Sequence, residues 1–395
     1  MVELNPMAPE FQANPYPTYE ELRRDAPVLH SEAWDFYAVS RYDDVVQVLK
    51  SPKLFSSSAI SMNISGKPTR TIINTDPPLH ANLRNMVNRA FTPRMVADME
   101  PRIREITAGL LDRVAAAGQL DLVNDLAIPL PVTVIAEILG VESERHADFK
   151  RWSNAVVGAE AATTDEEREE IGRDVAEFCD YFARVIEDRS AEPRDDLISA
   201  LVTAARDDAD VQLTPDDLLG FTGLLLIAGN ETTTNLIGNA VMALLRHPEQ
   251  MEQVLANRAL LPNFVEEALR WDSPVQFMFR TATADTEIAG TKIPAGATVI
   301  PIYASGNRDD SKFPDAARFD ITRNTQGHLA FGLGIHFCLG APLARLEARV
   351  ALEQLLLRMP ALRRIDEAPL ERVRSIFLRG IRSLPLEFDA AAVAA

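Results

Sequence analysis

The chain has 395 residues, 47% of them hydrophobic, and a formal net charge of −18. This apolar content allows a large buried core and excludes a wholly disordered chain. The excess of 58 acidic over 40 basic residues excludes nucleic-acid binding through the overall electrostatic field. Two cysteines cannot form a disulfide framework, which favours a reducing compartment.

The beginning of the chain carries no targeting signal that we can identify. Residues 1–17 are polar and rich in Pro and Asn, so we expect neither a signal peptide nor a membrane anchor. The most apolar stretch, residues 218–229, is shorter than the ~20 residues that a membrane span needs. We therefore expect a cytoplasmic protein with one domain over residues 1–395, a short flexible N-terminal segment and a flexible C-terminal tail.

Helical periodicity dominates residues 76–260, and strands are predicted near residues 36–40 and within residues 286–302. Residues 307–327 have no period and many turn-forming residues, which predicts an irregular segment. The sequence therefore predicts a mainly α fold with small β-sheets on one side.

Polar residues mark the starts of three of these helices. Asp76 is predicted to cap a helix, and Thr214 to cap a long helix that ends near Pro248. Asn263 and Glu266 have the spacing of a capping box.

The segment "FGLGIHFCLG", residues 331–340, places Cys338 just before an amphipathic helix. Unpaired N–H groups and the dipole at a helix start favour a thiolate and lower the thiol pKa. A zinc site is excluded because Cys179 has no paired spacing with Cys338, and His336 is poorly placed to activate a nucleophile. Two interpretations stay open on the residues alone: a small hydrophobic core cysteine, and an axial thiolate ligand of haem iron.

This segment resembles the haem-binding loop of the cytochromes P450, F-G-x-G-x-(H/R)-x-C-x-G, at every fixed position. A second segment, "AGNETTT" at residues 228–234, is similar to the family motif in the helix that crosses the opposite haem face. It interrupts an apolar helix with polar residues; a helix that merely surfaces there is the alternative interpretation. The resemblance implies haem b with Cys338 as the axial iron ligand, and Glu231 and Thr232 as a proton relay beside the oxygen site.

The family also holds the haem propionates with basic side chains. The resemblance implies that His80, Arg84, Arg280 and His336 contact the cofactor. His80 and Arg84 are four residues apart on one helix face, and the arginine fork suits carboxylates. The alternative for each is a solvated surface charge.

Glu267 and Arg270 lie one helical turn apart and can pair, a weak signal by itself. The resemblance implies the E-x-x-R pair of the family, which an arginine of the irregular segment completes; we predict Arg318 for that position. Its role would be to hold the cysteine loop.

The resemblance implies a monooxygenase that inserts one oxygen atom from O2 into a hydrophobic small molecule, by hydroxylation or epoxidation. Electrons would come from a separate ferredoxin or flavodoxin with its NAD(P)H-dependent reductase, docked near Arg345 and Arg349. A haem-thiolate peroxygenase that uses hydrogen peroxide, and a non-catalytic haem sensor, are the alternatives.

By analogy with the family, residues 56–65, 225–228 and 275–279 and the segment around Phe377 would line the substrate pocket. These residues are mainly apolar, which predicts a hydrophobic substrate of moderate size. The sequence does not determine the substrate, the redox partner, the oligomeric state, or whether the role is biosynthetic or catabolic.

Overall fold

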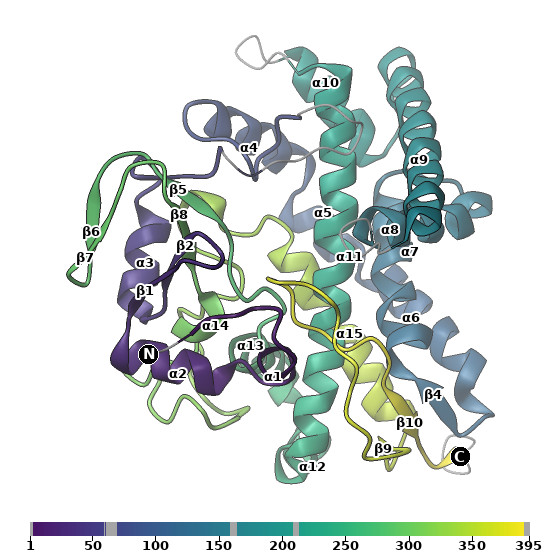
Figure 1. Ribbon diagram of the computed structural model, residues 1–395. Helices are drawn as coiled ribbons and strands as arrows, with labels where there is room; N and C mark the ends of the chain where they lie inside the picture. The colour runs from purple at the N-terminus through teal and green to yellow at the C-terminus, as the bar shows by residue number, and fades with distance from the viewer. Residues whose placement is uncertain (1–2, 59, 61–68, 159–163, 208–212, 391–395) are drawn as a thin grey trace.

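Figure 1 shows the computed structural model, which describes residues 3–390 except 59, 61–68, 159–163 and 208–212. The fold is mainly helical, as predicted, with small sheets on one side. The helices are α1 (Pro9–Ala13), α2 (Tyr16–Asp25), α3 (Tyr42–Lys50), α4 (Leu79–Ala90), α5 (Pro93–Asp98), α6 (Glu100–Ala115), α7 (Pro129–Ile138), α8 (His146–Gly158), α9 (Asp165–Ala191), α10 (Leu197–Asp207), α11 (Pro215–Arg246), α12 (Pro248–Ala256), α13 (Leu261–Trp271), α14 (Tyr303–Gly306) and α15 (Ala341–Arg358).

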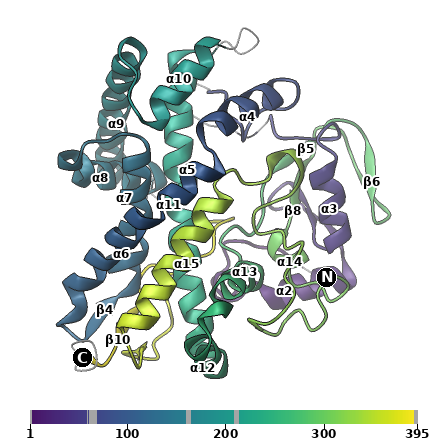
Figure 2. The same ribbon diagram turned by 180° about the vertical axis from the view of Figure 1, so that it is seen from behind.

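The longest helix, α11, is the axis of the molecule (Figures 1 and 2). It begins as predicted at Thr214, whose hydroxyl and the Asp217 carboxylate form a capping box. Because α11 is apolar on almost every side, it is buried, and it packs against α7, α9, α13 and α15. The helix with the "AGNETTT" segment and the helix after Cys338 therefore lie side by side in the main core.

The strands are β1 (Val28–Ser31), β2 (Phe36–Val39), β3 (Phe55–Ser56), β4 (Gln119–Asp121), β5 (Arg280–Ala282), β6 (Thr286–Ile288), β7 (Thr291–Ile293), β8 (Thr298–Pro301), β9 (Arg363–Arg364) and β10 (Pro385–Glu387). The largest sheet has the order β1-β2-β8-β5-β3; only β2 and β8 pair in parallel. It lies beside α2 and α3, away from the helices α6 to α9 (Figure 1). Its strand β5 begins with Arg280, in register with Val299, and so fixes one predicted haem contact.

Two helix starts differ from the prediction. Helix α4 begins at Leu79, after Pro77 and Pro78, and the Asp76 carboxylate instead accepts a hydrogen bond from the Ser57 backbone N–H at 3.0 Å. Asn263 lies inside α13, where its amide donates to the Ile321 carbonyl. In both cases the side chain predicted to cap the helix forms a hydrogen bond with a residue that is distant in the sequence.

The N-terminal segment also differs from the flexible segment that we expected. Leu4 and Phe11 are buried, and the Gln12 amide donates to the Ser375 carbonyl at 3.0 Å. Residues 3–13 are therefore anchored to the body of the fold. Among the described residues, no helix is both long and apolar enough to cross a membrane.

Candidate active site

The cysteine loop is a tight turn that favours glycine at two positions. Gly332 and Gly334 have φ of +68° and +76°, and a Cβ on Gly334 would lie 2.6 Å from the Leu49 carbonyl oxygen. The Cys338 N–H donates to the Phe331 carbonyl at 2.9 Å and closes the turn. The loop therefore presents Cys338 at the start of α15, as the sequence predicted.

The pKa of the Cys338 thiol differs from our prediction. Burial raises it, and this outweighs the opposing effects of the Gly340 and Ala341 N–H groups at the sulfur and of the Arg84 charge. The predicted helix start is present, but it lowers the thiol pKa by less than desolvation raises it. A coordinated metal ion would add a positive charge and so favour the thiolate form of Cys338.

The four basic residues predicted around the cofactor meet beside this loop. The His80 and His336 rings are 4.4 Å apart between centroids, and Arg280 acts on the pKa of both. Arg84, one helical turn after His80, faces Cys338 closely enough for the two charges to interact. The fold thus gathers residues from α4, β5 and the cysteine loop into one cluster.

Burial, together with the nearby arginines, keeps the two histidines neutral. Burial, then Arg280 and His80, lowers the pKa of His336 to about 3, and its Nε2 lies 3.0 Å from the Ser57 hydroxyl. Burial and Arg84 lower the pKa of His80, whose Nε2 is buried and has no hydrogen-bond partner among the described residues. The histidines can therefore offer hydrogen bonds, while the positive charge in this cluster belongs to Arg84 and Arg280.

Whether the cluster fits a haem depends on whether these two arginines are free to bind its propionates. Burial lowers the pKa of Arg84, and the buried Arg280 donates to its neighbour's carbonyl, Phe279, at 2.6 Å. In the ranges that the structure covers, neither forms an ion pair with a carboxylate. Two guanidinium groups, a His80 nitrogen without a hydrogen-bond partner and a half-buried thiol match the two propionates and the iron of a haem.

The three threonines of the "AGNETTT" segment in α11 have different surroundings. Thr234 is buried and donates to the Ala127 carbonyl at 2.9 Å, and Thr233 is buried as well. Thr232 is half-buried, and its hydroxyl donates to the Ala228 carbonyl at 2.7 Å. Thr232 and Ala228 thus share the one face along which this otherwise buried helix is accessible.

Glu231 is a half-buried carboxyl next to that face. Burial raises its pKa, and no cation of the described chain opposes the rise. The carboxyl therefore retains its proton closer to neutral pH than an exposed glutamate does. Such a group can hold and deliver a proton.

The cytochrome P450 family model matches residues 29–360 of the chain. The chain is a cytochrome P450. Its structure is similar to that of CYP109Q5 from Chondromyces apiculatus, with a TM-score of 0.90, 45% identity and 98% of both chains covered. It is also similar to CYP109E1 from Bacillus megaterium in complex with corticosterone, with a TM-score of 0.88 and 41% identity over 96% of this chain and 100% of that one.

Among curated proteins, the P450 is 39% identical to the Vitamin D(3) 25-hydroxylase of Pseudonocardia autotrophica, over 95% of this chain and 94% of the relative. These matches cover nearly the full length of both partners. The protein is thus a monooxygenase of the bacterial P450 type, and membership of this family implies a haem cofactor.

The structural lock of this P450 uses a different arginine from the one that we predicted. The Arg270 guanidinium donates twice to Glu267 at 2.7 Å, and both side chains are fully buried. Arg318 contributes only its backbone carbonyl to Arg270, at 3.2 Å, and its side chain is exposed. The third member is Arg323, with Nε 3.4 Å from the Glu267 carboxylate. In an aperiodic segment, the sequence does not reveal which arginine turns inward.

The two arginines predicted to receive an electron carrier are engaged within the P450. Arg345 donates to both oxygens of Glu266, at 2.6 and 2.8 Å, and covers the Phe331 ring at 4.5 Å. Arg349 donates to Glu100 at 2.8 Å. Their charges are therefore already balanced by carboxylates from α13 and α6.

One contact between the loop before α4 and the start of α11 was not predicted. Arg70, in the loop before α4, donates from its backbone to Asp217 at 2.8 Å and from its guanidinium at 2.6 Å. The preceding Thr69 packs so closely on α11 that a Cβ on Gly220 would lie 2.5 Å from its hydroxyl. Asp217 was visible in the sequence only as part of the α11 cap. Of the predicted substrate-pocket range 56–65, residues 59 and 61–65 lie outside the described residues.

Proposed function

We propose that this P450 is a haem-thiolate monooxygenase in which Cys338 is the axial ligand of haem b. One observation carries the proposal: the half-buried Cys338 lies beside Arg84, Arg280 lies beside the neighbouring His80 and His336, and no carboxylate of the described chain forms an ion pair with either arginine. Arg84 and Arg280 would pair with the propionates of a bound haem, and Cys338 would bind its iron, whose charge would offset that of the thiolate. His80 and His336 then contribute hydrogen bonds from neutral rings.

When bound, a haem with a thiolate ligand supplies the oxygen activation, because thiolate donation favours O–O cleavage. The protein supplies geometry and protons. The Thr232 hydroxyl donates its hydrogen to the Ala228 carbonyl. Its oxygen therefore remains available as a hydrogen-bond acceptor on the accessible side of α11. Glu231, with its raised pKa, is the group that replenishes protons from solvent.

The substrate that we propose is a hydrophobic molecule of about steroid size, which the enzyme hydroxylates. Half-buried apolar side chains support this class: Leu225 on α11, and Phe279 and Phe377, whose rings are 6.4 Å apart. The corticosterone complex of the CYP109E1 relative and the vitamin D(3) hydroxylase support a substrate of the steroid or secosteroid type. A ligand of this kind has few polar groups and is recognised mainly by shape.

Electrons would reach this P450 from a ferredoxin or flavodoxin and its reductase, and we place the protein in the cytoplasm on its cysteine content. The docking face proposed is the cysteine side, around Arg345 and Arg349. Because their charges are matched by Glu266 and Glu100, reversing one arginine also exposes a carboxylate. A docking role predicts that Arg349→Glu slows electron transfer and that high salt slows it in the unmodified enzyme. Unchanged rates would move the docking face elsewhere.

The axial ligand is tested by Cys338→His, with Cys179→Ser as the matched control. The reduced carbon monoxide complex of Cys179→Ser should keep the thiolate-type Soret band, and that of Cys338→His should lose it. Survival of the band in Cys338→His would overturn the assignment.

The peroxygenase and sensor alternatives are separated by turnover. A surrogate ferredoxin and reductase with NAD(P)H should support product formation from a steroid such as corticosterone, and hydrogen peroxide alone should support much less. Retention of Glu231 and Thr232 favours the first result, since a peroxygenase does not need a proton relay for O2. Equal turnover with peroxide alone would favour the peroxygenase.

A further inference from the structure

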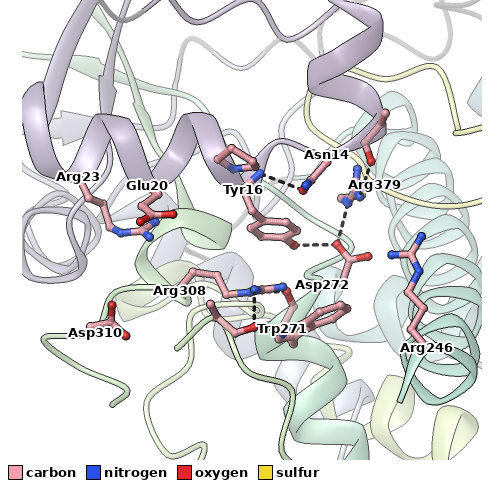
Figure 3. A pocket seen from close by; sticks show the side chains of 13 residues that line it. Asn14, Tyr16, Glu20, Arg23, Arg246, Trp271, Asp272, Arg308, Asp310 and Arg379 are labelled. Atoms are coloured by element: carbon pink, nitrogen blue, oxygen red, sulfur yellow. Dashed lines mark hydrogen bonds and ion pairs between the residues drawn. The ribbon is translucent and has the colours of Figure 1, made fainter. Parts of the chain in front are cut away.

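A pocket separate from the residues of the haem site lies where α2, the C-terminal ends of α11 and α13, and the segment after α14 meet (Figure 3). Its volume is about 450 Å³, and none of the residues assigned above to the haem site lines it. Four arginines contribute to its wall: Arg23, Arg246, Arg308 and Arg379. This concentration is unusual in a chain with a net charge of −18.

Arg308 is buried and is held without a carboxylate. Its guanidinium carbon lies 4.1 Å from the ring centroid of Tyr16 and 4.3 Å from that of Trp271, between the two rings. Arg308 is only 8% exposed. It donates to the carbonyls of Trp271, at 2.8 Å, and Ala317, at 3.0 Å. No carboxylate of the described residues forms an ion pair with it, and burial lowers its pKa to about 10.

A single carboxylate, Asp272, serves this wall of the pocket. Its Oδ1 accepts from both the Tyr16 hydroxyl and Arg379 Nε, at 2.7 Å each. The two terminal nitrogens of Arg379 donate to the carbonyls of residues 12 and 13, so each of its three nitrogens has a hydrogen-bond partner. Just behind it, burial and the Arg379 charge lower the pKa of Arg372 to about 10. One negative charge thus faces several positive ones.

Arg246 adds a further cation at the mouth. It is exposed in the last turn of α11, and its guanidinium points toward Asp272 across the pocket (Figure 3). Like Arg308, it forms no ion pair within the part of the chain that the structure describes. The acidic lining residues Glu20 and Asp310 lie on the opposite wall with Arg23, whose charge they stabilise (Figure 3). The pocket is therefore positive on one wall and close to balanced on the other.

We propose that this pocket binds a small molecule through a phosphate or carboxylate group, received by Arg246 and Arg308. Planar guanidinium groups suit both oxyanions, and a buried cation that has only carbonyl and ring partners gains most from a bound anion. Such a ligand would tie the ends of α11 and α13 to α2 and so stabilise the fold. The proposal is independent of the haem assignment, because the two sites share no residue.

The test is thermal unfolding of the purified holoenzyme with inorganic phosphate or citrate, against chloride at equal ionic strength. Binding to the folded state raises the midpoint with anion concentration. We expect phosphate or citrate to raise it beyond chloride, and Arg246→Gln to weaken the apparent affinity about tenfold, the value of one charge-assisted hydrogen bond.

Arg258→Gln is the matched control, since Arg258 is exposed and lies outside the pocket. It should bind like the parent, and its midpoint should shift by the same amount. Arg246 is exposed, so its replacement should not prevent folding. Shifts no larger than with chloride, or equal shifts in Arg246→Gln and the parent, would overturn the proposal.

Discussion

Glu267 is the position where a single substitution should be most costly. Its carboxylate accepts two hydrogen bonds from Arg270 and one from the Asp320 N–H at 2.9 Å, and it is fully buried. Glu267→Gln keeps the shape of the side chain but leaves the Arg270 guanidinium buried without a counter-charge. Breaking a buried pair in this way costs ~3–5 kcal/mol. The loss is a large fraction of a total stability of roughly 5–15 kcal/mol.

The measurement is urea unfolding of the purified variant, followed by far-UV circular dichroism, with haem content recorded in parallel. We expect a lower unfolding midpoint and low haem incorporation, because Arg270 also holds the Asn307 and Ala316 carbonyls, at 2.7 and 2.9 Å, in the segment that leads to the cysteine loop.

Two arginines of that segment give a matched comparison. Arg323→Gln removes the second cation at Glu267 and should cost about 1–3 kcal/mol. Arg318→Gln replaces an exposed side chain and should stay within about 0.5 kcal/mol of the parent. The reasoning fails if Glu267→Gln is as stable as the parent, or if Arg318→Gln costs more than Arg323→Gln.

Three further predictions concern the proton relay, the stability of the fold at acid pH, and the contact between Arg70 and Asp217. Thr232→Ala should consume NAD(P)H but release hydrogen peroxide at the expense of product. Thr233→Ala should keep the parent ratio of product formed to NAD(P)H oxidised. The reverse result would mean that the relay has been assigned to the wrong threonine. Burial raises the pKa of Glu266, but hydrogen bonds and charges from His328 and Arg345 outweigh it and lower the pKa from 4.5 to about 2. The contribution of Glu266 to the stability of the fold should therefore be complete above pH 4.5 and be lost as the pH falls toward 2. In Glu266→Gln the unfolding midpoint should depend less on pH over that window. Asp217→Asn should lower the unfolding midpoint more than Arg70→Gln, because Asp217 also holds the α11 cap; equal effects would mean that the capping contact contributes nothing.

Features fixed by neighbouring residues could be predicted from the sequence. The start of α11 at Thr214 depends on a capping box within four residues, and the cysteine loop depends on glycines within the same turn. The long helices and the strands near residues 36–40 and 286–302 followed from periodicity in the same way.

Features that depend on distant partners could not be predicted. The helix start beside Cys338 was visible, but the degree of burial that raises its pKa is a property of the whole fold. Arg345 looked like a free surface cation because its partner, Glu266, lies 79 residues earlier. The choice of Arg323 over Arg318 depends on turns that have no periodic signal.

The shared carboxylate of Asp217 matters for anyone who recombines this enzyme with a relative. Exchanging the loop before α4 would replace Arg70, which binds Asp217. A chimera that takes only this loop would leave Asp217 facing a foreign side chain, and could release the first turn of α11 together with the loop. A crossover design should therefore inherit residues 69–75 and 214–220 from the same parent, with Gly220 included so that the transplanted residue 69 has room.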